Sequence, residues 1–336
     1  MSEEDVHAMF AARRWGKHGD GKQVCPECGS VDSHYVIRGR KQWRCKESGC
    51  GRTFSVTTGT KLQDHKIPLK MILRIFQAYV NSNGGINAMY IQKMEGIAYQ
   101  TAFTLLHKFR EGLLDDRDLS PLERHVEIDG GHFSGRIRKP RKKIKTTGLP
   151  ARAKVGKKWF PTHPNRRIVV VLREISPIKG RGAVRSIVAV VKAENEALVT
   201  PVVHRYVKPG SEVQTDESNA FCRLPMRFEH RTVNHSVEFS TDDGVNENQA
   251  ESFFARGRRL GAEIRRITPK YMLDYMNELA WREDTRRQTT EQQIDSLLNA
   301  LLKTGMSKWW RGYWQGHHRA GELVFDEHAS SGFVVG

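Results

Sequence analysis

Three carboxylates stand at positions from which they could hold divalent metal ions. Asp129 ends the stretch VEID, Asp216 ends the stretch VQTD, and Glu251 lies in the stretch NQAESFF, 35 positions after Asp216. Magnesium prefers hard oxygen ligands, and two ions about 3.5–4 Å apart can activate a nucleophile and stabilise a leaving oxygen. Each acid also has an ordinary alternative, as a turn residue at a strand end or a helix-start residue favoured by the dipole. Together they predict a two-metal site for phosphoryl transfer.

Four of the five cysteines form two close pairs. Cys25 and Cys28 are separated by 16 residues from the pair Cys45 and Cys50. Two tight turns that each present two thiolates supply the four ligands of a tetrahedral Zn²⁺. The residues between the pairs predict a β-hairpin that turns at 38–40. We therefore predict a structural zinc ribbon.

The other potential zinc ligands are not needed in this prediction. His34 and His65 lie near the cysteines in the sequence, but the four thiolates complete the set. Cys222 stands alone and is predicted to be a small buried residue. The ribbon would present a basic surface for DNA, with protein binding as the alternative; this surface comprises Arg38, Arg40, Lys41, Arg44, Lys46 and Arg52.

The charge of the chain favours a polyanionic partner. Lys and Arg number 55 against 38 Asp and Glu, so the formal net charge is +17. Neutralising phosphates releases condensed counterions, which drives binding of such a chain to nucleic acid. Residues 136–158 hold eleven Lys or Arg and no acid. We predict that this insert contacts DNA phosphates, with a solvated loop as the alternative; the contacts are assigned to Arg138, Lys139, Arg141, Lys142 and Lys143.

No stretch approaches 18 consecutive apolar residues, and the first 19 residues lack the apolar core of a signal peptide. Clustered cysteines favour a metal site in a reducing compartment over a disulfide framework. A cytoplasmic location is expected.

The acids must be positioned by strands and helices of an α/β domain. From about residue 122, β-branched runs at 124–130, 167–175 and 185–195 predict strands, and a helix follows at 194–207. Shorter strands are expected at 211–216 and 230–236, and helices at 248–264, 270–287 and 289–304. This order predicts a mixed sheet.

The preceding part of the chain is predicted to be helical, and five regions are expected. Apolar residues at helical spacing fall in 68–80, 86–96 and 99–114, and the turn near Gly96 is compatible with a helix-turn-helix or with any small bundle. The predicted regions are an arm with a short helix at 1–22, the zinc ribbon at 23–60, a helical DNA-binding domain at 61–120, the catalytic domain at 121–290 with its basic insert at 136–160, and a C-terminal helix and tail at 291–336.

Several of these motifs occur in a familiar order. The ribbon is followed by FSVTTGT, VEIDG, TDESNAF, VNHS and N-x-x-E-S-F-F, with a basic residue seven positions after the Glu, and later by YMNELAWREDTR. Over about residues 23–287 this order resembles the zinc-ribbon DDE transposases of bacterial insertion sequences. The resemblance implies a ribonuclease-H-like catalytic domain that uses Mg²⁺. It also implies binding to the inverted repeats of an element, nicking, and attack of the freed 3′-hydroxyl on double-stranded target DNA.

For this chain, the resemblance implies that Asp129, Asp216 and Glu251 hold the Mg²⁺ ions. A homo-oligomer assembled on DNA and a nucleoid-associated location in a bacterium are expected with it. In some relatives the third position is an Asn three residues earlier, where Asn248 stands here; Glu251 suits a divalent ion better because its carboxylate is charged. Arg258 stands where relatives often have Lys, and it can still clamp a phosphate. Gly130 stands where relatives often have another acid.

Two other functions remain open at this point. A DNA-binding regulator, or an inactive transposase-derived protein, would use the ribbon and helices without any chemistry. An intact set of carboxylates in basic surroundings argues against that reading. A nuclease that hydrolyses DNA without joining strands would share the first chemical step, and the sequence does not separate it from a transposase.

Overall fold

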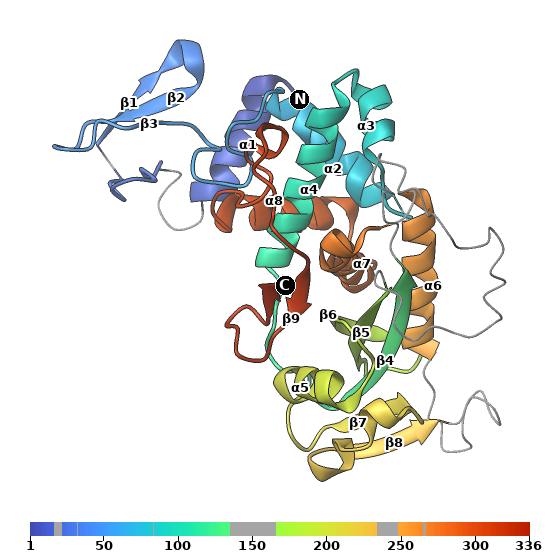
Figure 1. Cartoon of the computed structure of the whole chain (residues 1–336). Helices are drawn as coiled ribbons and strands as arrows, with labels where there is room; N and C mark the ends of the chain where they lie inside the picture. The colour runs from blue at the N-terminus through green and yellow to red at the C-terminus, as the bar shows by residue number, and fades with distance from the viewer. Residues whose placement is uncertain (17–21, 32, 83, 135–165, 234–247, 265–266) are drawn as a thin grey trace, which may run out of the picture. The chain divides into compact units, whose positions relative to one another are not determined.

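The computed structural model describes the chain except for residues 17–21, 32, 83, 135–165, 234–247 and 265–266 (Figure 1). The chain divides into two units. The first comprises residues 1–120, 256–264 and 274–320, and the second comprises 121–255, 265–273 and 321–336. In the described part of the chain, no helix has the length and apolar character needed to cross a membrane.

The second unit is built on a five-stranded sheet. Its strands are β4 (His125–Ser134), β5 (Arg166–Ile175), β6 (Ala183–Val191), β7 (Glu212–Asp216) and β8 (Glu229–Val233), in the order β6-β5-β4-β7-β8. Strand β5 pairs antiparallel with both β6 and β4, whereas β7 and β8 run parallel to β4. Helix α5 (Glu196–Tyr206) makes the crossover that joins β6 to the parallel strand β7. This is the ribonuclease-H-like mixed sheet expected from the sequence.

Helices protect both faces of the central strands. In β5, Val169, Val170, Val171 and Leu172 are all fully buried, which explains why this strand is a continuous β-branched run without alternation. Successive strand residues point to opposite faces. A Cβ added to Gly130 would lie 2.7 Å from Glu194, which precedes α5. One added to Gly131 would lie 2.4 Å from the ring of Phe254 on α6 (Asn248–Glu263), so only glycine lets this helix approach the sheet.

The end of the chain adds a small hairpin to this unit. Strands β9 (Leu323–Phe325) and β10 (Phe333–Val335) pair antiparallel. Within the second unit, Arg167 on β5 pairs with Glu322, and Arg205 on α5 donates to the carbonyls of Glu327 and Ser330. The last residues are therefore attached to the sheet and to α5, although the sequence predicted only an irregular tail.

The first unit packs five helices around one apolar core that also includes residues of the zinc ribbon. The helices are α1 (Glu3–Trp15), α2 (Leu69–Asn81), α3 (Ala88–Glu95), α4 (Tyr99–Asp115) and α8 (Thr290–Lys303). The first turns of α1 and α8 are fixed by capping boxes, formed by Ser2 with Asp5 and by Thr289 with Gln292. Helix α1 buries Val6 and Phe10 completely, so the predicted N-terminal arm is an integral part of this core.

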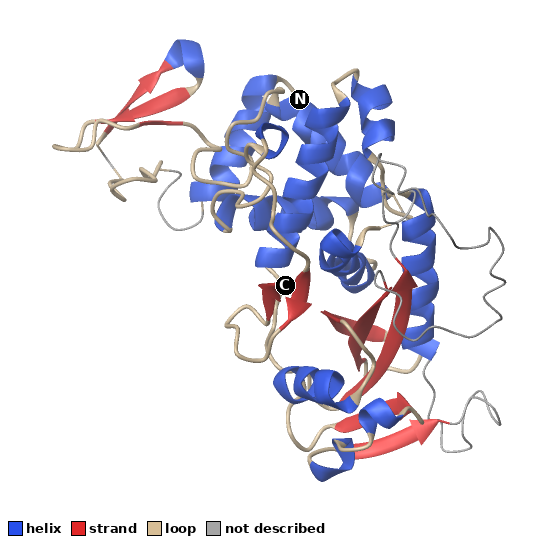
Figure 2. Ribbon diagram, viewed as in Figure 1, coloured by secondary structure: helices blue, strands red, loops and turns tan. Residues whose placement is uncertain are grey.

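The two helices expected at 86–96 and 99–114 are present as α3 and α4, drawn in blue with the other helices in Figure 2. Gly96 ends α3 in the left-handed conformation (φ 65°), which suits a residue without Cβ. Every residue of α4 from 105 to 114 is buried, charged ones included. If this pair of helices contacts DNA, α3 and the first turn of α4 are the parts available for it. Tyr90, Gln92 and Lys93 on α3 and Gln100 on α4 are exposed.

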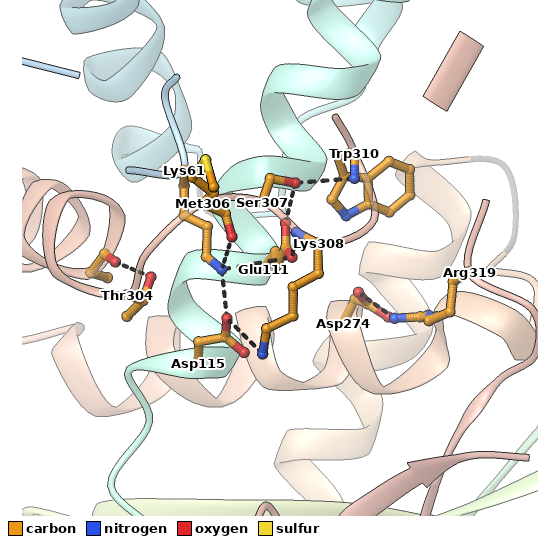
Figure 3. A network of polar contacts seen from close by, with 11 residues as sticks. Lys61, Glu111, Asp115, Asp274, Thr304, Met306, Ser307, Lys308, Trp310 and Arg319 are labelled. Carbon is orange, nitrogen blue, oxygen red and sulfur yellow. Dashed lines mark hydrogen bonds and ion pairs between the residues drawn. The ribbon is translucent and has the colours of Figure 1, made fainter. Parts of the chain in front are cut away.

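Buried charges on α4 are compensated by paired partners (Figure 3). Lys61 lies 2.6 Å from Asp115 and 3.6 Å from Glu111, and Glu111 also accepts from the Ser307 hydroxyl at 2.6 Å. These contacts connect Lys61 to α4, and they connect α4 to Ser307, which follows α8. Removing one member of a buried ion pair commonly costs 3–5 kcal/mol, because the other charge remains buried.

Helix α7 (Met272–Thr285) contributes a second buried set from its part in the first unit. Glu278 accepts from Arg110 at 2.7 Å and from Arg282 at 2.8 Å. Arg282 also donates to the backbone carbonyls of Tyr79 and Ser82, at the end of α2. Asp274 on the same helix pairs with Arg319 at 2.7 Å (Figure 3). Two polar residues of the motif YMNELAWREDTR, Glu278 and Arg282, therefore hold α7 to α4 and α2.

Candidate active site and zinc centre

The four paired cysteines converge on one point. Their sulfur atoms all lie within 4.8 Å of one another, with 3.7 Å between Cys25 and Cys50 and 3.6 Å between Cys28 and Cys45. A tetrahedral Zn²⁺ with Zn–S bonds of about 2.3 Å would place its sulfurs about 3.8 Å apart. The observed separations fit a zinc ion with four thiolate ligands, and the predicted ribbon is confirmed.

Tight turns and a small sheet present these sulfurs. Gly29 follows the first pair with φ 73° and donates its amide to the carbonyl of Cys25 at 2.9 Å. Strands β1 (His34–Ile37) and β2 (Gln42–Cys45) form the predicted hairpin, and β3 (Thr53–Phe54) pairs with β2. The His34 ring nitrogen lies 3.0 Å from the carbonyls of Gln23 and Ser30, so this side chain supports the first turn.

Cys222 differs from the prediction. It is exposed, and its thiol donates to the Glu196 carboxylate at 3.2 Å. The residue follows the short 3₁₀ helix Asn219–Phe221, whose Ala220 and Phe221 supply the buried contacts instead. Residue type alone predicts a buried thiol, but the turn after Phe221 leaves the Cys222 side chain exposed to solvent.

The two aspartates lie on neighbouring strands of the sheet. Asp129 is on β4 and Asp216 is the last residue of β7; both are half-buried. These strands are parallel, and Glu127 is paired with Gln214. The pairing of the two strands ends there, and Asp129 and Asp216 each lie two residues further along their own strand. Asp129 accepts from the amide of Gly130 at 2.6 Å, and Asp216 from the amide of Ser218 at 3.0 Å.

The third predicted acid lies on a different element. Glu251 is in the first turn of α6, and its side chain is exposed. Asn248 is the first residue of that helix, and its side chain lies outside the described part of the structure. Arg258 is exposed two turns further along α6. Within the described residues, only the four cysteines bring three or more metal-binding groups within 4.8 Å, so the carboxylates do not form a closed cluster.

The start of α6 is attached to β4 by a buried acid that was not predicted from the sequence. Glu127, two residues before Asp129, accepts from the amides of Gln249 and Ala250, the first at 3.1 Å. Arg173 on β5 donates to the carbonyl of Gln249 at 2.6 Å. Burial raises the pKa of Glu127 to about 7, although the amides and Arg173 act in the opposite direction. The helix that carries Glu251 is thus held next to the strand that carries Asp129.

We expect Glu127→Ala to lower the free energy of unfolding by about 1–3 kcal/mol, because the first amides of α6 lose their acceptor. Glu127→Gln keeps an acceptor oxygen in the same place and should be less destabilising. Urea unfolding followed by circular dichroism measures both. Equal destabilisation by the two changes would contradict a role based on accepting hydrogen bonds.

A fourth acid lies against β4, beside Gly130 and His132. Glu194 is in the loop between β6 and α5, and its side chain is 18% exposed. Burial, helped by the negative charges of Asp216 and Asp129 and opposed by Arg166, raises the pKa of Glu194 to about 7. Asp129 and Asp216 supply this edge of the sheet with hard oxygen donors of the kind that Mg²⁺ prefers. In its donor chemistry, this region fits the metal that the fold implies.

Other predicted residues lie outside the described part of the chain. This holds for Arg138, Lys139, Arg141, Lys142 and Lys143 of the basic insert. It also holds for residues 234–236 of the VNHS motif.

Comparisons with known proteins cover most of the chain. Residues 121–284 match the family model for an ISXO2-like transposase domain, and residues 1–53 match the model for a transposase zinc-ribbon domain. No curated protein matches the chain. Among solved structures, one titled "Crystal structure of the Mos1 Strand Transfer Complex" is 13% identical and has a TM-score of 0.26; the match covers 74% of this chain and 79% of that one. By the two family matches, taken with the mixed sheet and the four-cysteine centre, the chain belongs to the zinc-ribbon DDE transposases.

Proposed function

We propose that this transposase binds the inverted-repeat ends of an insertion sequence and catalyses Mg²⁺-dependent cleavage and transfer of DNA strands. One observation carries the proposal. Asp129 and Asp216 lie on adjacent parallel strands of a ribonuclease-H-like sheet, each two residues beyond the pair Glu127 and Gln214, within the segment that matches the transposase family. Carboxylates on neighbouring strands can share metal ions that act on one phosphodiester.

Each residue of the site has a separate task in this proposal. When bound, a pair of Mg²⁺ ions would activate the attacking oxygen and stabilise the leaving oxygen. Asp129, on the central strand, would bind both ions and Asp216 one of them, with Glu251 as a direct ligand of the second ion. Arg258, exposed on the same helix as Glu251, would clamp a DNA phosphate.

The two chemical steps use the same site. In the first, water attacks a phosphodiester at the element end, and the bond to the 3′-oxygen breaks to leave a free 3′-hydroxyl. In the second, that hydroxyl attacks a phosphodiester of the target, so one bond forms as another breaks. We propose that a homo-oligomer performs both steps, because the two ends of one element must be held together.

Regions outside the sheet would supply DNA affinity. In the ribbon, Arg40, Arg44, Lys46 and Arg52 are exposed, whereas Lys41 is paired with Glu4 at 2.8 Å. We propose that the ribbon at 23–60 and the helices at 61–120 bind the element ends, and that the domain at 121–290 carries out catalysis. The C-terminal helix and tail at 291–336 would support the fold.

Neutralising the basic insert should weaken DNA binding regardless of sequence. Changing Arg138, Lys139, Arg141, Lys142 and Lys143 to Gln should make the log–log dependence of affinity on salt shallower by roughly 0.9 per lost phosphate contact. Fluorescence anisotropy at several salt concentrations measures this slope. Lys179 and Arg181, in the turn between β5 and β6, serve as the control pair. An unchanged slope in the insert variant would show that the basic insert is a solvated loop that does not contact DNA phosphates.

The DNA that flanks the gene distinguishes a transposase from a DNA-binding regulator. Inverted repeats and short target duplications at its borders are expected, and a duplex made from those repeats should be nicked at the element boundary only when Mg²⁺ is present. Binding of that duplex without nicking under any metal condition would favour the regulator.

A further inference from the structure

The small sheet of the zinc ribbon has two faces of different character. Directly paired residues on neighbouring antiparallel strands present their side chains on the same face. Trp43 on β2 is paired with Phe54 on β3, and both side chains are buried. Rings of α1 contact this pair: His7 stacks on Trp43 with 5.4 Å between ring centroids, and Trp15 meets the same indole edge-on at 5.3 Å. One face of the sheet is therefore occupied by α1.

The opposite face is open to solvent. Tyr35 on β1 is paired with Arg44 on β2, and Arg44 with Thr53 on β3, so these three residues form one row across the sheet. All three are exposed, and Tyr35 is 42% exposed. Lys46 Nζ lies 5.7 Å from the centroid of the Tyr35 ring. An aromatic ring thus stands next to two cations on the solvent-facing side of the ribbon.

This face carries positive charge that the ribbon itself does not neutralise. Residues 33–46 hold five Lys or Arg and no acid. Among the residues that the structure describes, no carboxylate pairs with Arg44 or Lys46, whereas Lys41 is paired with Glu4 of α1 at 2.8 Å. Nucleic acid combines phosphate charge with apolar sugar and base surfaces, so it complements unpaired cations beside an exposed ring. Charge and ring together favour DNA over protein as the partner of this face.

We propose that the ribbon contacts double-stranded DNA through this face, with Arg44 and Lys46 on phosphates and the Tyr35 ring packed against a sugar of the backbone. The inference rests on the proposed function, because it assigns the ribbon's share of DNA binding to one face of its sheet. Phosphates and sugars recur at every position of a duplex, so these contacts add affinity without selecting a sequence. The Trp43 face and Lys41 are engaged with α1 instead.

Fluorescence anisotropy with the full-length, zinc-loaded protein tests this assignment, on an end duplex and on a duplex of unrelated sequence. Arg44→Gln should make the log–log dependence of affinity on salt shallower by roughly 0.9 on both duplexes. Tyr35→Ala should weaken binding to both about 5-fold or more, as expected for an aromatic contact with a nucleotide. The salt slope of that variant should stay unchanged, because the ring carries no charge. Zinc content and unfolding midpoints verify that each variant is folded.

Two matched controls separate this face from the rest of the ribbon. Val36 follows Tyr35 on β1, is 58% exposed, and is paired with Trp43 on the other face. Val36→Ala should therefore leave affinity and slope unchanged. Lys41→Gln removes the same charge as Arg44→Gln, but Glu4 already pairs with that charge, so the slope should change by less. Equal losses of affinity in Val36→Ala and Tyr35→Ala would overturn the assignment to one face.

The remaining outcomes separate this inference from the proposed function. Wild-type affinity and salt slope in both Arg44→Gln and Tyr35→Ala would overturn the inference and leave the face to a protein partner. The proposed function would stand in that case, provided that these variants still nick end DNA in Mg²⁺. Wild-type protein that binds neither duplex would contradict the inference and the proposed function together.

Discussion

Asp129→Asn is expected to abolish both nicking of element ends and joining to target DNA. The change keeps the size of the side chain but removes a negative charge from the ligand shared by both ions. A loss of ~10³-fold or more is the scale seen when a preorganised group that stabilises transition-state charge is removed. Affinity for end DNA should persist, because it comes from the ribbon, the helices and the basic insert. Single-turnover cleavage of a labelled end duplex, together with anisotropy for binding, measures both quantities.

Asp216→Asn should behave in the same way, and its neighbour in the chain provides the control. Glu217 is exposed directly after Asp216, so Glu217→Gln removes the same charge from the adjacent position and should leave cleavage close to the wild-type rate. Near wild-type cleavage by both Asp129→Asn and Asp216→Asn would show that the reaction does not depend on these carboxylates.

The ambiguous third position is resolved by two further changes on α6. If Glu251 is the ligand, Glu251→Gln is crippling and Asn248→Ala is mild. The reverse result would move this position three residues towards the start of the helix. If both changes are mild, neither residue supplies the third ligand.

Removal of zinc is the second change with a large expected effect. The ribbon is a three-stranded sheet of short strands whose buried apolar side chains are few, chiefly Trp43 and Phe54. Zinc-finger peptides gain about 10–16 kcal/mol of apparent binding energy from the metal, and this energy is coupled to folding. We therefore expect residues 23–60 to unfold on chelation, with loss of end binding, while the helical core formed around Phe76 and Phe109 persists.

Metal analysis and limited proteolysis test this expectation. Freshly purified protein should contain one zinc ion per chain, and chelator should make the ribbon protease-sensitive. Cys45→Ser should reproduce the loss, whereas Cys222→Ser, which changes an exposed thiol outside the ribbon, should not. A Cys45→Ser protein that retains zinc and binds end DNA normally would contradict the assignment.

Much of the architecture follows from local patterns in the sequence. The β-branched run 167–175 became β5, and the helical spacing of 68–80 became α2. The four cysteines identify their own site because thiolate spacing alone fixes a zinc ribbon. Such features depend on residues close together in the chain, so their periodicity can be read directly.

The site was less accessible to prediction because it depends on long-range contacts. Residues 192–195 extend a β-like run, yet β6 ends at Val191 and the chain turns, which brings Glu194 back against Gly130. Glu127 alternates with apolar residues as a solvent-facing strand position would, but α6 covers it. Neither contact has a signal in the local sequence. The roles of Asp129, Asp216 and Glu251 stay predictions until the variants are made.

The most direct test of the transposase proposal follows the element end itself. A labelled duplex that carries a pre-cut inverted repeat with a free 3′-hydroxyl is incubated with the protein, Mg²⁺ and unlabelled plasmid. We predict that the label becomes covalently attached to the plasmid in denaturing gels, and that Asp129→Asn protein yields no such product. Protein that nicks uncut end DNA in Mg²⁺ but never joins the pre-cut end to plasmid would contradict the proposal and identify a nuclease instead.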